Sequence, residues 1–360
     1  MSQFVDHLVT QIGEWLKGAG PESDIVISSR VRLARNLADF PFNPQATPQS
    51  RKEVEGLLRE KLTDAQVIRG LTWVPLGHAP IVDRQVLLER HLISKEQAAI
   101  GKEYGGGPTE RGVAVSRREN LAVMVNEEDH LRLQCLRSGL QLDEAWAELN
   151  ALDDALARSA PFAFSPRFGF LTCCPTNAGT GLRVSVMVHL PALVIAKQLD
   201  KVLEALSRIN FNVRGFFGEG SQAMGDFYQI SNQVTLGKVE EEMIEEMKKI
   251  VPQIIGFERT CRQKLLESNR KRLEDSVWRA HGILSSARCI TTEETLERLS
   301  ALRLGVNLGL LTGVPIKTIN ELLIFSQPGH LQKVEGRTLE TEERDAARAD
   351  FIRKRMAELK

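Results

Sequence analysis

The sequence predicts an α+β fold in which strands and helices share the chain up to about residue 240, followed by an all-helical part. Three observations predict it. The 360 residues exceed the length at which a single hydrophobic core usually stops growing, so a larger and a smaller domain are expected. Short apolar runs separated by polar or glycine-bearing turns, which are typical of strands, lie in the first part. After residue 238 apolar residues recur at helical spacing instead, beginning with Met243, Met247, Ile250 and Val251.

The composition excludes several classes of protein. Lys plus Arg and Asp plus Glu both number 47, and this balance argues against a general nucleic-acid binder. No apolar run is long enough to span a membrane, and the N-terminus has no signal-peptide cleavage site. The five cysteines are odd in number and form no CxxC, so neither a disulfide framework nor a zinc site is expected. These features together predict a protein of the reducing cytosol with no metal site of its own.

The elements of the first part follow from periodicity. Phe4, Leu8, Ile12 and Trp15 fall on one face of a predicted helix, so residues 1–20 form a short helical segment. Glycine-rich residues 101–112 are expected to be a loop. Strands are predicted within 24–36, 121–125, 168–172, 182–190 and 227–234, and helices over 143–158 and 191–207.

The second part is predicted to contain helices over 258–285, 292–305 and 338–359. Pro252 and Gly256 are the residue types that commonly interrupt a helix, and we expect them to mark the boundary between the parts. The predicted domains are therefore residues 1–240 and 257–360.

The first chemical motif is the string SSRVR at 28–32. Alternation along a strand places Arg30 and Arg32 on the same face, opposite an apolar face that includes Val31. Two arginines on one face suit a polyanionic phosphate. An edge strand held by ion pairs is the alternative, and this motif alone favours that alternative.

The second motif is NEEDHLR at 126–132, which directly follows an apolar strand. Its three consecutive acids are Glu127, Glu128 and Asp129. A carboxylate is the natural partner of a guanidinium, through two parallel hydrogen bonds. A solvated turn is the alternative and, without other motifs, the better one.

Two further motifs join apolar strands. In TCCPTNAGTGLR at 172–183, a cysteine near cationic groups would favour thiolate, although buried cysteines more often act as small hydrophobes. In RGFFGEG at 214–220, three glycines allow the backbone to approach a ligand, or simply form a tight turn. The string is not a Walker loop, and the protein-kinase motifs HRD and DFG are absent from the chain.

These motifs, in this order, resemble the phosphagen (guanidino) kinase family, and most closely its bacterial protein-arginine kinase branch. The resemblance is carried by SSRVRLARN, VNEEDHLRLQ, LTCCPTNAGTGLR and RGFFGEGSQAMGDFYQISNQ, and it continues to ERDAARAD near the end of the chain. It implies a catalytic domain with an antiparallel sheet flanked by helices. It also implies transfer of the ATP γ-phosphate, with Mg²⁺, to a guanidinium group.

The resemblance also implies roles for individual residues. Glu128 would face the guanidinium, with the thiol of Cys174 beside it. Residues expected around ATP are Ser28, Ser29, Arg30, Val31, Arg32, His91, Arg132, Arg183, Val184, Ser185, Val186, Met187, Arg214, Gly215, Phe216, Phe217, Gly218 and Glu219.

The second catalytic acid is less directly implied. Counting from the RG motif, as in small-molecule members, reaches Gln222, which cannot act as a base. The bacterial branch has the GE of RGxxGE, which is Glu219 here, and Glu219 is our prediction. Phe217 stands where small-molecule members carry a further arginine.

The expected acceptor is an arginine side chain of another protein. Metabolite kinases of this family carry a helical domain before the SSRVR strand, whereas 23 residues precede Asp24 here. This difference favours an open site for a protein chain. A kinase for free arginine or creatine, and a non-catalytic adaptor that binds phosphorylated arginine, are the alternatives. An adaptor would have little reason to keep the arginines together with Glu128 and Glu219.

The resemblance implies further expectations about regulation and partners. The RDAARA string contains Arg344, Asp345 and Arg348, and an allosteric pocket for phosphorylated arginine is expected there. Spacing alone instead favours a solvated helix with weak ion pairs. A stress-response role with an activator protein, a Clp ATPase and a homodimer is also expected from the family.

Overall fold

The protein is described by a computed structural model, over residues 2–66, 68–99, 109–215 and 224–359. Within these residues an eight-stranded antiparallel sheet has the order β2-β3-β4-β5-β1-β8-β10-β9, and a separate hairpin pairs β6 with β7. The strands are β1 (Val26–Arg35), β2 (Leu71–Pro75), β3 (Gly112–Ser116), β4 (Leu121–Val125), β5 (Leu131–Ser138), β6 (Phe164–Ser165), β7 (Gly169–Phe170), β8 (Leu182–His189), β9 (Phe211–Gly215) and β10 (Phe227–Asn232). β1 therefore lies in the interior of the sheet.

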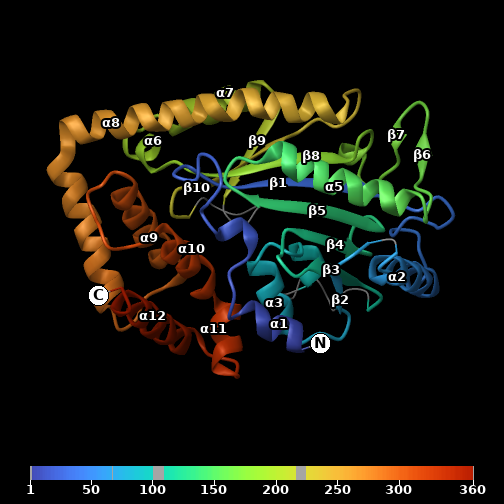
Figure 1. The fold of residues 1–360 in the computed structure, drawn as a ribbon, viewed down its shortest axis with the longest axis horizontal. Helices are drawn as coiled ribbons and strands as arrows, with labels where there is room; N and C mark the ends of the chain where they lie inside the picture. Colours follow the sequence, from blue (N-terminus) through green and yellow to red (C-terminus); the bar gives the residue numbers. More distant parts are fainter. Residues whose placement is uncertain (1, 67, 100–108, 216–223, 360) are drawn as a thin grey trace.

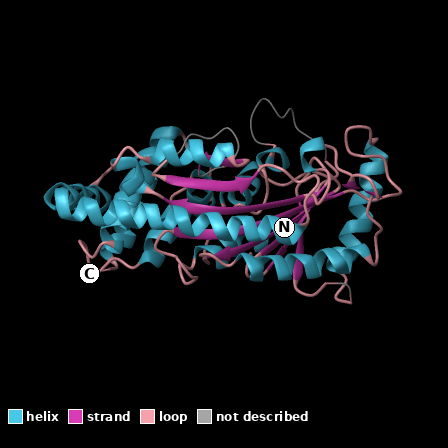
Figure 2. Cartoon of the chain, turned by 90° about the horizontal axis from the view of Figure 1, so that it is seen from above, coloured by secondary structure: helices cyan, strands magenta, loops and turns pink. Residues whose placement is uncertain are grey.

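One face of the sheet is covered by α2, α5 and the first half of α8, with one continuous hydrophobic cluster between them. The helices of the first part are α1 (Ser2–Leu8), α2 (Pro48–Thr63), α3 (Ile81–Glu89), α4 (Lys95–Ala98), α5 (Leu142–Ala157), α6 (Pro191–Ile195) and α7 (Leu199–Arg208), with single turns η1 (Glu14–Leu16) and η3 (Pro175–Asn177). Figure 2 shows the strands as a central layer with helices on either side.

The second face of the sheet is covered mainly toward its two ends. A cluster of α1, α3 and α4 packs over β2, β3 and β4. A second cluster joins η1 and the helical part to apolar residues of β1, β5, β8 and β10, namely Ile27, Leu136, Met187 and Phe227. The helical part consists of α8 (Glu240–Ser286), α9 (Thr292–Asn307), α10 (Ile316–Phe325), α11 (Pro328–Glu335) and α12 (Thr341–Ala357). Polar side chains occupy the face between these two clusters.

Most of the predicted elements are present. The strand at 121–125 is β4, and the predictions at 24–36, 182–190 and 227–234 correspond to β1, β8 and β10. The helices predicted at 143–158, 292–305 and 338–359 correspond to α5, α9 and α12. Sequence patterns did not indicate β2, β3, β5 or β9. The glycine-rich 101–112 lies mostly outside the described residues, and β3 begins at its last position.

Three predicted elements have different bounds in the structure. The N-terminal helix ends at Leu8, and Trp15 belongs to the separate turn η1, because Gly13 is extended (φ −67°, ψ 159°). The helix expected over 191–207 is two helices, since Lys197 adopts a positive φ of 53° after α6. The strand expected at 168–172 is reduced to the two residues of β7.

Pro252 and Gly256 were predicted to end a helix and mark the boundary between the two parts. Both instead lie inside the continuous helix α8. A proline in a helix removes one backbone hydrogen bond, but the neighbouring Val251, Ile254 and Ile255 are buried against the sheet and hold the helix in place. The helix bends instead at Asn269, which has non-helical dihedral angles, and turns there toward α9 and α12 (Figure 1). No helix of the described residues is long and apolar enough to cross a bilayer.

Candidate active site

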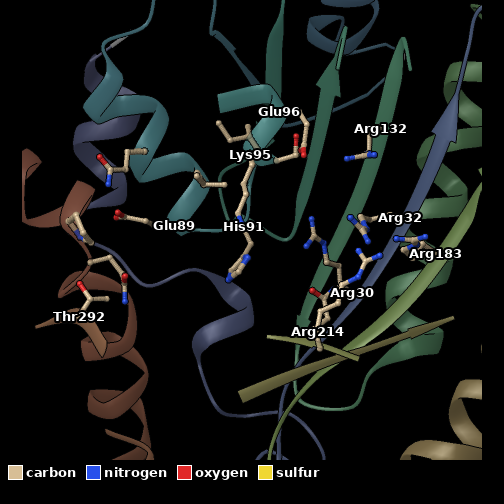
Figure 3. Close-up of a pocket in the computed structure, with 17 residues that line it drawn as sticks. Arg30, Arg32, Glu89, His91, Lys95, Glu96, Arg132, Arg183, Arg214 and Thr292 are labelled. Carbon is tan, nitrogen blue, oxygen red and sulfur yellow. The ribbon is translucent and has the colours of Figure 1, made fainter. Parts of the chain in front are cut away.

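Arginines from neighbouring strands converge on the second face of the sheet. Arg30 and Arg32 of β1 point into a cavity of about 460 Å³, while Val31 and Leu33 lie in the core on the opposite side. Strand alternation thus produces the shared face that the sequence predicted. The same cavity is lined by arginines from β5, β8 and β9, namely Arg132, Arg183 and Arg214 (Figure 3).

The positive charges of the neighbouring arginines repel one another. Burial and the neighbouring Arg132 and Arg183 lower the pKa of Arg30 to about 9, and similar causes lower the pKa of Arg32 well below its usual value. Gln134 of β5 accepts hydrogen bonds from Arg30 at 3.1 and 2.5 Å, but it is neutral. Such a concentration of like charge around one cavity fits a bound polyanion.

His91 borders this cavity at a strained position. Its φ is +57°, and its ring makes an edge-to-face contact with Trp15, with ring centroids 5.2 Å apart. Burial and the charge of Arg30 lower the pKa of His91 to about 3, so the ring is neutral near pH 7. His91 therefore contributes a flat, uncharged surface beside the arginines.

The remaining predicted nucleotide residues lie on both faces of β1 and β8. Ser28, Ser185 and Met187 border a smaller cavity next to Arg30 and His91. Ser29 faces away and donates to the carbonyl of Gly139 at 2.8 Å. The side chains of Val31, Val184 and Val186 lie in the hydrophobic core, so they do not face the cavity.

The three consecutive acids after β4 occupy different environments. Glu127 is buried and accepts from Arg132 Nη1 at 2.7 Å and from Ser94 Oγ at 2.6 Å. Asp129 is also buried and accepts from Asn36 Nδ2 at 2.6 Å and from the backbone N–H of Cys173 at 2.7 Å.

Glu128 is the open member of the three. Its side chain is 40% exposed, and its contact with Arg132 Nη2 is long, at 3.5 Å. Partial burial raises the pKa of its carboxyl above the usual value, while the charge of Arg132 opposes that shift. Sequence reasoning selected Glu128 but missed the supporting positions of Glu127 and Asp129, which depend on contacts distant in sequence.

The adjacent cysteines also differ. Cys173 lies beside Asp129, and burial together with that charge raises the pKa of its thiol to about 12. Cys174 is partly exposed, and its sulfur lies 3.0 Å from Thr176 Oγ1 at the start of η3. Both cysteines are partly buried, and the raised pKa of Cys173 keeps its thiol protonated.

Part of the predicted site lies outside the described residues. Gly215 ends β9, but Phe216, Phe217, Gly218, Glu219 and Gln222 belong to the segment that the structure does not describe. The prediction that Glu219 is the second acid therefore stays a prediction.

The RDAARA string lies on α12 as expected, but its two arginines differ in burial. Arg344 is partly exposed and donates to the carbonyl of Leu339 and to Thr341 Oγ1, both at 3.1 Å. Arg348 is buried and donates to the carbonyls of Ser326 and Ile290, both at 2.8 Å, and to Asp345 at 2.5 Å. Of the motif, Arg344 and Asp345 are the members accessible to a ligand.

Within the described ranges, no group of three or more His, Cys, Asp or Glu side chains is arranged to hold a metal ion.

Comparison with known families gives two matches that together cover most of the chain. Residues 53–261 match the ATP:guanido phosphotransferase C-terminal catalytic domain, and residues 270–360 match the protein-arginine kinase McsB C-terminal domain. A protein-arginine kinase of Halothermothrix orenii is 44% identical over 354 residues, which are 98% of each chain. A protein-arginine kinase of Desulforamulus reducens is 44% identical over 351 residues and 96% of each chain.

Solved structures agree with the family matches. A duplicated taurocyamine kinase of Schistosoma mansoni with bound transition-state analog components is 28% identical, with a TM-score of 0.60. The similarity covers 70% of this chain and 35% of that one. Lombricine kinase shares the fold, with a TM-score of 0.57, 24% identity, and coverage of 73% of this chain and 76% of that chain.

Proposed function

We infer the chemistry of this site from one premise: the chain belongs to the ATP:guanido phosphotransferase family, in its protein-arginine kinase branch. It transfers the γ-phosphate of ATP to the guanidinium groups of arginine side chains in proteins. The arginine cluster of β1, β5, β8 and β9 is the main observation from which we assign roles to individual residues.

The arginine cluster binds the triphosphate. Phosphoryl transfer requires aligned reactants and cations around the shifting phosphate charge, more than it requires covalent participation by the protein. Arg30, Arg32, Arg132, Arg183 and Arg214 supply guanidinium groups from four strands of one sheet, which is a rigid support. Burial lowers the pKa of Arg30 and Arg32, with mutual repulsion adding to the shift, and bound phosphate would relieve that repulsion.

Glu128 orients the acceptor. A guanidinium has a pKa above about 12 and no free lone pair, so the attacking nitrogen must lose a proton as it reacts. The accessible carboxylate of Glu128 grips two N–H groups and accepts that proton. Glu127 binds Arg132 from the buried side, and this contact holds a phosphate-binding arginine next to the acceptor site.

The residues of this cavity would hold Mg²⁺ through the phosphates of ATP rather than in a cage of protein ligands. Mg²⁺ at phosphoryl-transfer sites is commonly held by substrate phosphates, water and one or two carboxylates. The cavity fits this arrangement because arginines dominate it and Glu96 is among its few acids. When bound, the ion would neutralise charge on the phosphates.

The acceptor is a protein chain with exposed arginines. In support, Glu128 is accessible from outside, and the relatives of matching length are protein-arginine kinases. The expected activator protein, Clp ATPase, homodimer and cytoplasmic location stay predictions.

The direct test is incubation with Mg²⁺ and ATP in the presence of an unfolded arginine-rich protein, followed by analysis of acid-labile phosphate. We expect phosphoarginine on the protein, and little on free arginine or creatine at equal guanidinium concentration. Faster transfer to a free metabolite would favour the metabolite-kinase alternative. Binding of phosphorylated arginine without any transfer would favour the adaptor.

We also propose that α12 holds a second site, at which Arg344 takes the phosphate of phosphorylated arginine and Asp345 takes its guanidinium. Asp345→Ala in the full chain should abolish calorimetric binding of free phosphoarginine in the presence of saturating nucleotide. Unchanged binding by that variant would leave the solvated-helix alternative. For the two sites to be allosterically coupled, phosphoarginine binding at α12 must also change ATP affinity or the transfer rate at the arginine-lined site.

A further inference from the structure

The cavity that holds the arginines has a second wall built by the helical part of the chain. Thr292 at the start of α9, and Gln327 and Pro328 at the start of α11, line it together with Arg30 and Arg32. Figure 3 shows Thr292 and Glu89 across the cavity from the arginines, with His91 between them. A single cavity thus joins a catalytic strand face to helices that begin more than 50 residues after the sheet ends.

The two walls differ in charge. One wall is the cluster of five arginines. The other combines the neutral Thr292, Gln327 and Pro328 with the carboxylate of Glu89. A nucleotide also has one strongly anionic end and one neutral, largely apolar end. Electrostatics therefore orient its phosphates toward the arginines and its ribose and base toward the helical wall.

Glu89 attaches the helical wall to the catalytic part. Its carboxylate accepts from the backbone N–H of Gly329 at 2.7 Å and of His330 at 3.1 Å, and from His330 Nδ1 at 2.7 Å. These N–H groups belong to the first turn of α11, where a carboxylate is favourable. A side chain at Gly329 would place a Cβ 2.9 Å from Glu89, so this close approach depends on glycine. The next residues after Glu89 are Arg90 and His91, so the attachment directly adjoins the nucleotide site.

Arg348 hydrogen-bonds to the backbone of both segments that form the helical wall. Its Nε donates to the carbonyl of Ser326, immediately before Gln327, and its Nη1 donates to the carbonyl of Ile290, two residues before Thr292. The side chain is 1% exposed. One guanidinium therefore connects both segments that line the cavity, and this arrangement requires the two-pronged donor geometry of arginine.

We propose that the helical part forms the base-binding wall of the ATP site and that Arg348 is the positioning residue for this wall. The proposal rests on the proposed function, because it takes the arginine cluster as the triphosphate site. It also links the RDAARA helix to nucleotide binding, because Arg348 on that helix bonds to the segments that form the wall. The reaction itself does not involve Arg348, which touches neither ATP nor the acceptor.

The test compares two probes on the full chain by calorimetry: adenylyl imidodiphosphate and inorganic tripolyphosphate, each with Mg²⁺. Thr292→Trp fills the cavity at the helical wall and leaves the arginines in place. We expect this variant to bind adenylyl imidodiphosphate about tenfold more weakly or worse. Its affinity for tripolyphosphate should change by less than about twofold. The proposal fails if adenylyl imidodiphosphate binds unchanged, or if both probes weaken equally.

Arg348→Met tests the positioning role. We expect the KM for ATP to rise about three- to tenfold, with kcat at saturating ATP nearly unchanged, because the wall loosens while the catalytic groups stay in place. Arg348→Lys should recover part of the loss, since an ammonium can reach one carbonyl. Arg355→Met is the matched control on α12, because Arg355 pairs only with Glu321 and Glu358 in the described structure and touches neither wall segment.

Folding of each variant is checked by thermal unfolding, and Thr292→Trp remains decisive if Arg348→Met does not fold. A drop in kcat without a change in KM for folded Arg348→Met would overturn the positioning role. Failure of the wild-type chain to bind either probe would contradict the proposed function. If the wild-type chain binds both probes and Thr292→Trp binds them equally well, only the proposal of a base-binding wall is contradicted.

Discussion

At the scale of single residues, environment separates side chains that the sequence presents as equivalent. Glu127, Glu128 and Asp129 are three consecutive acids, yet two are buried in hydrogen bonds and one is accessible. Cys173 and Cys174 likewise differ in their neighbours, because Cys173 lies beside Asp129 whereas the sulfur of Cys174 lies beside Thr176 Oγ1. A reactive group must reach its substrate, whereas a supporting group must be held by its neighbours, and adjacent positions on the chain satisfy these two needs separately.

Glu128→Gln should lower the rate of phosphoryl transfer at least about 10²-fold, because orientation of the acceptor and proton acceptance are both lost. Nucleotide affinity should stay within a few-fold of wild type. Single-turnover kinetics and calorimetry measure the two effects separately.

Glu127→Gln is the matched control for this substitution. It removes the charge that holds Arg132, so nucleotide affinity should fall together with the rate. If Glu127→Gln abolished transfer and Glu128→Gln were active, the two assignments would have to be exchanged.

Cys174→Ser should reduce transfer without unfolding the chain, and thiol reagents should label Cys174 before Cys173. The physical reason is the raised pKa of Cys173, about 12, which keeps that thiol protonated. Labelling followed by mass spectrometry, with and without nucleotide, measures the order. Equal labelling of both thiols with no loss of rate would contradict a functional role.

At the scale of elements, β1 carries three arginines in two different environments. Arg30 and Arg32 face the cavity, whereas Arg35 is 1% exposed and forms a salt bridge of 2.8 Å with Asp153 of α5. Arg35 also donates to the carbonyl of Thr180 at 2.8 Å and lies over the Phe170 ring. The strand thus presents two arginines to the cavity at its middle and holds a helix and a loop in place at its end.

Substitutions on this strand should separate binding from stability. Arg35→Ala should lower the free energy of unfolding by about 3–5 kcal/mol, because it leaves Asp153 buried without its partner. Arg32→Ala should reduce nucleotide affinity but leave the unfolding free energy equal or higher, since it relieves repulsion from neighbouring arginines.

Urea unfolding without nucleotide, and calorimetry with adenylyl imidodiphosphate, measure the two quantities. The assignment of β1 as a phosphate-binding strand would be wrong if Arg32→Ala destabilised the fold as strongly as Arg35→Ala and bound nucleotide normally. In that case the ion-paired strand alternative would be the better description.

At the scale of the whole molecule, the helical part is packed into the catalytic part. The hydrophobic cluster of α9, α10 and α12 includes residues of β1, β5, β8 and β10. His189 of β8 lies at this junction, where its Nε2 is 2.8 Å from Ser300 Oγ of α9 and its ring stacks on Phe227. Burial lowers the pKa of His189 well below its usual value, with the charges of Arg303 and Arg262 adding to the shift.

This buried histidine predicts a loss of stability in mild acid. Above about pH 6.5 the ring is neutral in both the folded and unfolded states, so it contributes no pH dependence. Below that pH the unfolded state binds a proton that the folded state does not, so stability falls as the pH decreases. At pH 5.5 the loss from one such group is about 1.4 kcal/mol.

His189→Gln should therefore have a lower free energy of unfolding at pH 7.5 but a smaller decrease between pH 7.5 and 5.5. Urea unfolding at the two pH values, without nucleotide, gives both numbers. Raised pKa values at Asp153 and Glu258 act in the opposite direction, but they are common to both proteins and cancel in the comparison. Identical decreases in wild type and variant would contradict the prediction.

The sequence by itself determined the order of α/β and helical parts, the shared face of Arg30 and Arg32, and the family to which the motifs point. These features depend on local periodicity and residue chemistry, which neighbouring positions carry. The tertiary structure decided which acid is open, that Ser29 and Val31 face away from the cavity, and that α8 continues through Pro252. It also decided that Thr292 and Gln327 line the same cavity as arginines from strands far away in sequence, and that Arg348 bonds to the segments before both residues. Such placements depend on contacts between distant segments, and no local pattern records which segments will meet.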